Sequence, residues 1–458
     1  MGKPIVLFAL LSIQLAYAKF PFGNLKPFTH RPLKDLGEPL ILTDYIEKNQ
    51  IVEAKELAQV PSNNFLNIDS YSGYFTVDKG NGSNLFFWFF PSTNNYEKDP
   101  VLLWLEGGPG TASVYTIFGQ SGPFVVENGE IELREYSWNK NFSVLYIDQP
   151  VGTGFSFSTK GQFLSDQTQI GEHLYSALTQ FFTVFSELQQ NEFYISGESY
   201  AGKFVPAIAH TIHQNNPNAF LKINLKGISI GNGISDPIHQ LGYGDLLYQI
   251  GLIDYNTLQL FNEIENLVIY LIEQQRYQEA TDYFLDLVNV KISNKTGLLN
   301  LFNYIKDDND FSYEWASFIV QKNIREALHV GNITFDFQSK GACEALYGDV
   351  LKSVASWVSE LLSHYKVLIY NGQLDIIVGY VLTENYLRKL EFSASSEYLQ
   401  AERKIWKLDD KVVGYVKTAG NLTDVMVRNA GHIAIADQPQ AVFNLIYNFV
   451  NNIPIAGN

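Results

Sequence analysis

Five short apolar runs along the chain end abruptly in turns of glycine, proline or polar residues. They are residues 101–105, 144–147, 193–195, 367–370 and 425–427. Continuous apolar runs of this length are typical of strands buried on both faces, as in a parallel sheet. Between them, apolar residues recur at helical spacing, as at Phe204, Ile208 and Ile212. The alternation predicts the α/β class, with a mostly parallel central sheet flanked by helices.

The stretch from about residue 238 to residue 332 follows a different pattern. Apolar residues keep helical spacing, as at Leu258, Phe261 and Ile264, with glutamine and glutamate between them. No clear buried strand interrupts it. Because α/β segments flank the stretch on both sides, we expect a helical cap inserted over the ligand-binding edge of the sheet. A separate helical domain is the alternative.

Charge and cysteine content exclude several classes of protein. Asp and Glu number 48 against 32 Lys and Arg, and the net charge of −16 argues against nucleic-acid partners. The single cysteine, Cys343, excludes an intramolecular disulfide and a cysteine-based zinc cluster, and it predicts a buried free thiol. No G-K-[ST], helix-opening G-x-G-x-x-G or H-E-x-x-H motif is present, so we expect neither a cofactor nor a metal. The sequence is compatible with either a monomer or a homodimer.

The first residues read as a targeting segment. Lys3 precedes an apolar run, 5–16, which ends at the small-residue site Ala16-Tyr17-Ala18. This pattern predicts a secretory signal peptide at 1–18 and a mature chain at 19–458; a buried N-terminal helix is the alternative. No later run is long enough for a membrane helix, so we expect no membrane anchor. Glycosylation sequons begin at Asn81, Asn141, Asn294, Asn332 and Asn421, as suits a secreted protein.

The segment Gly197-Glu198-Ser199-Tyr200-Ala201 lies between a predicted strand and a predicted helix. A nucleophile elbow needs this strand–turn–helix context, because the sharp turn lifts the serine hydroxyl above the sheet. The usual second glycine is displaced by one position, to Gly202. Ser199 is therefore the candidate nucleophile, and a chance Gly-Ser turn is the alternative.

Three further polar turns follow predicted strands. Glu106-Gly107-Gly108-Pro109-Gly110 is a glycine-rich loop of the kind that presents backbone N–H groups to an oxyanion. Asp375 and His432 each follow a later strand, and His432 is the one histidine of the eight that sits in such a glycine turn. The order Ser199, Asp375, His432 is that of the α/β-hydrolase triad.

With these residues in view, the sequence resembles the serine carboxypeptidase family, most of all its vitellogenic-like members. The matching blocks are WLEGGPG (104–110), IDQPVGTGFSF (147–157), GESYAGKFVPAIA (197–209), IGNGISDP (230–237), VLIYNGQLDIIVG (367–379) and GHIAIADQP (431–439). The likeness spans roughly residues 37–450. It implies an α/β-hydrolase fold with a helical cap, and the release of C-terminal amino acids from peptides through an acyl-enzyme.

The resemblance also implies a role for each matching residue. Ser199 would be the nucleophile, His432 the general base and acid, and Asp375 the group that orients the imidazole. The backbone N–H groups of Gly108 and Tyr200 would form the oxyanion hole. The pocket for the α-carboxylate of a peptide with a free C-terminus would be lined by Trp104, Glu106, Gly107, Gln120 and Glu198.

Three positions depart from the family pattern. The family usually carries an amide where this chain has Glu106, and commonly a Glu where it has Gln120, so acid and amide are exchanged. A carboxylate facing the substrate carboxylate repels it, so Glu106 must be protonated to bind. We therefore predict activity at acidic pH. Ile435 also replaces a proline that stiffens the loop after His432.

The leading interpretation is an acid-acting serine carboxypeptidase that is secreted or delivered to a lysosome-like compartment. One alternative is an acyltransferase that uses Ser199 in the same way but passes the acyl group to an alcohol. Another is an impaired secreted homologue that binds or stores, because fold alone does not fix function.

Overall fold

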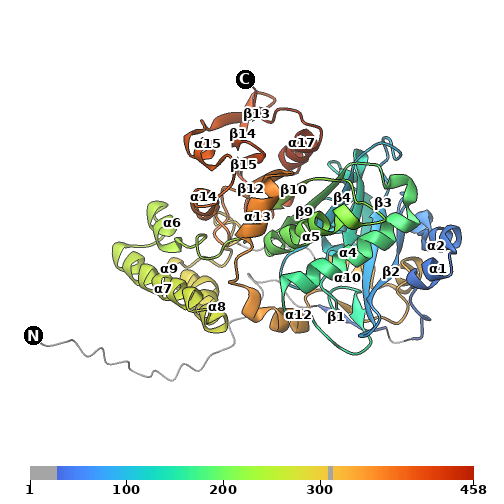
Figure 1. Cartoon of the computed structure of the whole chain (residues 1–458). Helices are drawn as coiled ribbons and strands as arrows, with labels where there is room; N and C mark the ends of the chain where they lie inside the picture. The colour runs from blue at the N-terminus through green and yellow to red at the C-terminus, as the bar shows by residue number, and fades with distance from the viewer. Residues whose placement is uncertain (1–27, 33, 308–312, 458) are drawn as a thin grey trace, which may run out of the picture.

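A central sheet of eleven strands organises the computed structural model, which describes residues 28–457 except 33 and 308–312 (Figure 1). In spatial order the strands are β13 (Lys404–Leu408), β14 (Lys411–Ala419), β15 (Leu422–Val427), β12 (Lys366–Gly372), β10 (Leu225–Gly231), β9 (Phe193–Glu198), β4 (Val101–Leu105), β7 (Ser143–Ile147), β3 (Ser83–Phe90) and β2 (Tyr71–Asp78), with β8 (Phe157–Ser158) beside β3. The expected signal peptide, 1–18, lies outside the described residues.

The middle of the sheet is parallel and its edges are antiparallel. The six strands from β15 to β7 pair in parallel, whereas β2, β3, β8, β13 and β14 pair antiparallel. This confirms the predicted α/β class. The five apolar runs are β4, β7, β9, β12 and β15, but they omit β10. In β10 glycine and serine alternate with isoleucine from Gly227 to Ile230, which breaks the apolar run.

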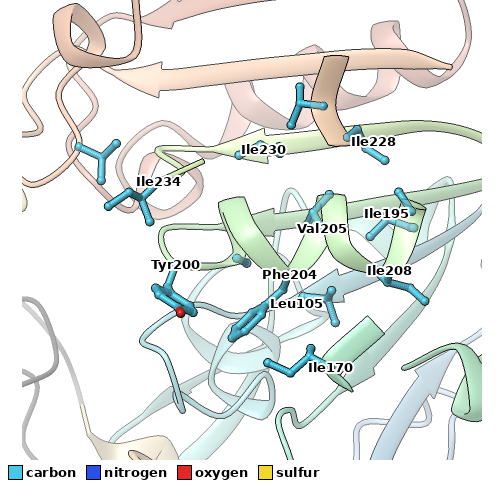
Figure 2. Packing of buried hydrophobic residues seen from close by; sticks show 14 of the residues in the cluster. Leu105, Ile170, Ile195, Tyr200, Phe204, Val205, Ile208, Ile228, Ile230 and Ile234 are labelled. Atoms are coloured by element: carbon cyan, nitrogen blue, oxygen red, sulfur yellow. The ribbon is translucent and has the colours of Figure 1, made fainter. Parts of the chain in front are cut away.

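Helices cover both faces of the sheet. On one face α4 (Gln167–Val184) and α5 (Ala201–Asn215) share a hydrophobic core with the strands, and α13 (Ala355–Leu362) packs beside α5. Figure 2 shows Val205 and Ile208 of α5 close to Ile195 of β9 and Ile228 of β10. A second core joins α3 (Val114–Gly119) and α17 (Pro439–Val450) to the sheet. Because α5 follows β9 directly, its packing fixes the turn that joins them.

The elements that the structure describes between residues 238 and 332 are all helical. They are α6 (Tyr243–Gln249), α7 (Tyr255–Glu273), α8 (Tyr277–Asp286), a π-helical turn (Leu287–Lys291), α9 (Ile292–Thr296), α10 (Glu314–Ile319) and α11 (Lys322–Ala327). Figure 1 shows α6 to α9 gathered to one side of the sheet. By contrast, α10 and α11 join the second core, because Trp315 and Phe318 pack against Phe118 of α3. Residues 238–332 therefore pack against two different parts of the described fold.

Smaller elements complete the described fold. They are β1 (Thr29–His30), α1 (Thr43–Glu47), α2 (Ile51–Ala58), β5 (Phe124–Glu127), β6 (Glu130–Leu133), β11 (Phe335–Asp336), α12 (Lys340–Ala345), α14 (Tyr380–Leu387), α15 (Ser395–Gln400) and α16 (Ala434–Asp437). The strands β5 and β6 form a hairpin, and β1 pairs with β11. Over the residues described, none of the helices has both the length and the apolar character that crossing a membrane requires.

Candidate active site

Ser199 occupies a tight turn between β9 and α5. Its φ of 63° lies in the left-handed region, which is costly for any residue with a Cβ and is common at functional turns. The glycines beside it are needed for space. A Cβ on Gly197 would lie 2.7 Å from the carbonyl oxygen of Leu105, and a Cβ on Gly202 would lie 2.6 Å from the nitrogen of Ile234. The sequence thus folds here into the predicted elbow.

The structure brings Ser199, His432 and Asp375 into contact at the carboxyl ends of β9, β15 and β12. His432 Nε2 lies 2.8 Å from Ser199 Oγ, and His432 Nδ1 lies 2.8 Å from Asp375 Oδ2. All three side chains are buried. An ionised Asp375 only accepts, so Nδ1 donates to it and Nε2 is left to accept from the serine hydroxyl.

Asn232 is a residue of this site that the motif analysis did not single out. It follows β10, and its Nδ2 donates to Asp375 Oδ2 at 2.7 Å while its Oδ1 accepts from the Gly372 backbone at 3.2 Å. The Val378 backbone N–H donates to the other oxygen, Asp375 Oδ1, at 3.2 Å. Asn232 therefore helps to fix the carboxylate by bonding to the same oxygen, Oδ2, that His432 contacts. The available signal was a polar residue between two glycines at a strand end.

The glycine-rich loop after β4 lies directly against the elbow. A Cβ on Gly107 would lie 2.7 Å from the Tyr200 nitrogen and 2.8 Å from Ser199 Cβ, so only glycine fits there. Gly108 has a φ of 109°, which also favours glycine. Within the described part of the chain, the backbone N–H groups of Gly108 and Tyr200 donate to no other group. Two N–H groups beside Ser199 are thus left for a ligand.

Glu106, Gln120 and Glu198 form one buried cluster next to this loop. The Gln120 amide donates to Glu198 Oε1 at 3.1 Å and to Glu106 Oε2 at 3.4 Å. Glu106 also accepts from the Thr116 hydroxyl at 2.5 Å and from the Gly107 N–H at 3.1 Å. The exchanged acid and amide therefore share hydrogen bonds around one centre. Thr116 is a member of the cluster that sequence reasoning missed.

The two carboxyl groups of this cluster are hard to ionise together. Burial raises the pKa of Glu198 well above its usual range, and the adjacent charge of Glu106 raises it further. Burial also raises the pKa of Glu106, against the lowering effect of its bonds from Thr116 and Gly107. Because Glu106 accepts several hydrogen bonds and Glu198 Oε2 has no partner in the described residues, the proton that the pair retains longest belongs to Glu198.

Trp104 completes the set of predicted pocket residues. It is fully buried in β4, and its indole N–H lies close enough to the Glu106 carboxyl to lower the pKa of that group, although it makes no hydrogen bond of good geometry. The Trp104 indole therefore borders the acidic cluster.

A cavity of about 510 Å³ opens beside this site. Its walls come from α3, the β5–β6 hairpin, residues 300–306, α10 and the segment after His432. Its wall combines aromatic side chains, among them Tyr115 and Trp315, with charged ones, among them Arg134, Lys306 and Glu314. Since Gln120 follows α3 directly, one helix borders both the cavity and the acidic cluster.

The remaining predicted residues lie outside this centre. Cys343 is a buried free thiol, as expected; its Sγ lies 2.9 Å from the Pro109 carbonyl oxygen, and burial raises its pKa to about 12. Among the sequons, Asn294, Asn332 and Asn421 are exposed, whereas Asn81 and Asn141 are half-buried.

Fold and site together define a serine hydrolase of the α/β-hydrolase class. The family model described as serine carboxypeptidase matches residues 61–452, so the chain belongs to that family and is a serine-type carboxypeptidase. A solved prohormone-processing carboxypeptidase from Saccharomyces cerevisiae has the same fold. It superposes with a TM-score of 0.78 at 24% identity, covering 88% of this chain and 98% of that one.

Curated relatives match nearly the whole chain. Venom serine carboxypeptidase of Apis mellifera is 45% identical over 94% of this chain and 95% of its own length. Vitellogenic carboxypeptidase of Aedes aegypti is 42% identical over 95% and 94%, and the probable serine carboxypeptidase CPVL of Homo sapiens is 43% identical over 92% and 91%. The resemblance seen in the sequence blocks is therefore confirmed.

Proposed function

We propose that this carboxypeptidase releases the C-terminal amino acid of peptides through an acyl-enzyme on Ser199. Ser199 Oγ attacks the scissile carbonyl carbon while His432 Nε2 takes its proton, and the C–N bond breaks as His432 returns that proton to the leaving amine. Water activated by His432 then hydrolyses the ester. The observation that carries the proposal is the pair of 2.8 Å contacts linking Ser199, His432 and Asp375.

Two groups of residues would hold the substrate around this nucleophile. The backbone N–H groups of Gly108 and Tyr200 would donate to the oxyanion that forms on the carbonyl oxygen. The α-carboxylate would be bound by Trp104, Glu106, Gly107, Gln120 and Glu198. The Trp104 indole N–H, which borders the acidic cluster at Glu106, supports this assignment. The adjoining cavity would take the side chain of the departing residue.

The direct test is release of free amino acid from N-blocked dipeptides between acidic and neutral pH. We expect release that is greatest at acidic pH. No release at any pH from the folded protein would contradict the proposal and favour the acyltransferase or the binding homologue. An added alcohol acceptor would then separate those two, because only the acyltransferase forms an ester product.

The acidic cluster makes binding of the substrate carboxylate dependent on pH. Protonated carboxyls donate to the incoming carboxylate, whereas an ionised pair repels it. Since the pKa values of Glu106 and Glu198 are both raised, the protonated forms persist to higher pH than for ordinary carboxyls. Affinity is therefore complete at low pH and is lost as the pH rises through the raised pKa values.

The Glu106→Asn variant should keep activity to higher pH than the wild type. The Asn amide donates to the substrate carboxylate at any pH, and the substitution removes one of two adjacent negative charges. Between pH 5 and 7 we expect the KM of the variant to rise less steeply than the KM of the wild type. At pH 7 the KM of the variant should be about tenfold lower than that of the wild type. The measurement is KM against pH with one N-blocked dipeptide.

Glu265→Gln is the matched control for this variant. Glu265 is another buried carboxyl, on α7, and burial raises its pKa to about 7. It does not belong to the acidic cluster, so its removal should leave the pH dependence of KM in place. An unchanged or more acidic profile for Glu106→Asn, or a shift in Glu265→Gln alone, would refute the assignment to the cluster.

We further propose that the protein travels through the secretory pathway to the cell exterior or to a lysosome-like compartment. The predicted signal peptide, the sequons and the venom and vitellogenic names of the relatives support this. An acidic destination would also suit the acidic cluster.

A further inference from the structure

Residues 300–306, here called the bracing segment, run between the two loops that carry Asp375 and His432. On one side they bond to the loop after β12. The Ile376 N–H donates to the Leu301 carbonyl at 3.0 Å, and the Tyr304 N–H donates to the Leu374 carbonyl at 3.2 Å. The residues on both sides of Asp375 are therefore tied to this segment.

On its other side the bracing segment is tied to the loop that carries the histidine. The His432 backbone N–H donates to the Phe302 carbonyl at 2.6 Å. A Cβ on Gly431 would lie 2.2 Å from that carbonyl oxygen and 2.7 Å from Asn303 Cβ, so Gly431 is required for this close approach. The bracing segment thus contacts the backbone that carries His432 directly.

Asp437 adds polar links between the same two segments. Its Oδ2 accepts from the Gly431 N–H at 2.7 Å and from Asn303 Nδ2 at 2.9 Å, and its Oδ1 pairs with Lys306 Nζ at 2.8 Å. The carboxylate is only partly exposed, so these bonds keep more of their strength than surface pairs do. The bracing segment therefore contacts the chain just before His432, at Gly431, and again after it, at Asp437.

The ring of Phe302 lies flat on the imidazole of His432. The ring centroids are 4.7 Å apart and the planes differ by 10°. Both side chains are buried, which excludes water from this face of the imidazole. Asp375 and Ser199 contact the two nitrogen atoms at the edge of the imidazole. A ring stacked on the face of the imidazole therefore does not block these contacts.

We infer that Phe302 is a positioning residue for His432 and that its ring stabilises the imidazolium formed during acyl transfer. This inference rests on the proposed catalytic role of His432. It adds to the site a residue, Phe302, that comes from the mainly helical stretch 238–332. An aromatic face attracts a cation in a site that excludes water, and the imidazolium appears only after Ser199 has lost its proton. The ring therefore acts on the transition state more than on the resting enzyme.

The experiment measures how fast a small fluorophosphonate labels Ser199 in the full-length protein. This probe needs the triad but does not need the carboxylate pocket. Phe302→Leu should label about three- to thirtyfold more slowly than wild type, and Phe302→Tyr, which keeps the ring, should label within about twofold of it.

Phe182→Leu is the matched control for lost packing. Phe182 is a buried phenylalanine of α4 that packs edge-on against Phe193, away from the site. Both leucine variants should lower Tm by similar amounts, but only Phe302→Leu should slow labelling. Labelling of Phe302→Leu at the wild-type rate, or an equal slowing in Phe182→Leu, would overturn the inference.

A second arm separates ring electrostatics from ring shape. Pentafluorophenylalanine at position 302 keeps nearly the same shape but reverses the charge distribution of the ring face. We expect slower labelling than wild type with an unchanged Tm, and an unchanged rate would contradict stabilisation of the imidazolium. If wild-type protein is not labelled at all, the proposed function itself fails; if it is labelled and position 302 has no effect, only the present inference fails.

Discussion

The Ser199→Ala variant should lose at least about 10⁴-fold in kcat for release of a C-terminal amino acid. The hydroxyl is the only atom at the elbow that can carry the acyl group, and His432 then has no proton to accept. Alanine has a Cβ as serine does, so the backbone at φ 63° is strained to a similar degree and the fold should persist. Circular dichroism and Tm would verify folding.

Ser196→Ala is the matched control for the loss of a buried hydroxyl. Ser196 lies on β9, three residues before the elbow, and its Oγ accepts from Ser229 Oγ at 2.7 Å. We expect this variant to keep kcat within about threefold of wild type. Fluorophosphonate labelling located by mass spectrometry should mark Ser199 in both wild type and control. Undiminished release by Ser199→Ala would mean that another group carries the acyl step.

The sequence predicted the fold well where a strand is apolar throughout and ends in a turn. Such runs gave β4, β7, β9, β12 and β15, because burial on both faces leaves no place for polar residues. It missed β10, whose glycines lie against neighbouring strands. A Cβ on Gly227 would lie 2.8 Å from the Lys366 carbonyl oxygen, so close strand packing suppresses the apolar signal.

The contact among Ser199, Asp375 and His432 was predictable for a related reason. Each of these residues follows a parallel strand, and the carboxyl ends of such strands meet at one edge of the sheet. Thr116 and Phe302 were not predictable in this way. Thr116 depends on the rotation of α3 about its axis, and Phe302 depends on the path of an irregular segment between two loops. No local sequence pattern reports the rotation of a helix or the path of an irregular segment.

The exchange at Glu106 and Gln120 shows what the sequence could supply and what needed the structure. The resemblance to the family indicates that acid and amide have changed places, but only the structure brings both within hydrogen-bonding distance of each other and Gln120 within reach of Glu198. The cluster keeps the same number of carboxyls and amides. The direct neighbour of Gly107 has nevertheless become a titratable group, which is why we expect the pH dependence to change.

The Asp375→Asn variant should lower kcat about 10³- to 10⁴-fold with little change in KM. Asp375 Oδ2 accepts from both Asn232 Nδ2 and His432 Nδ1, and Oδ1 accepts from the Val378 N–H. An Asn amide cannot accept at both positions, so at least one of these donors faces an NH₂ group. The variant also lacks the negative charge that stabilises the imidazolium.

Asp424→Asn provides the comparison that makes this loss specific. Asp424 is a buried carboxyl of β15, and burial raises its pKa to about 6, so at pH 5 it is mostly protonated and an amide replaces it closely. At that pH we expect Asp424→Asn to keep kcat within about threefold of wild type, while Asp375→Asn loses its activity. Retention of activity within about tenfold in Asp375→Asn would show that the carboxylate acts by shape alone, and the charge-based account of His432 would have to be abandoned.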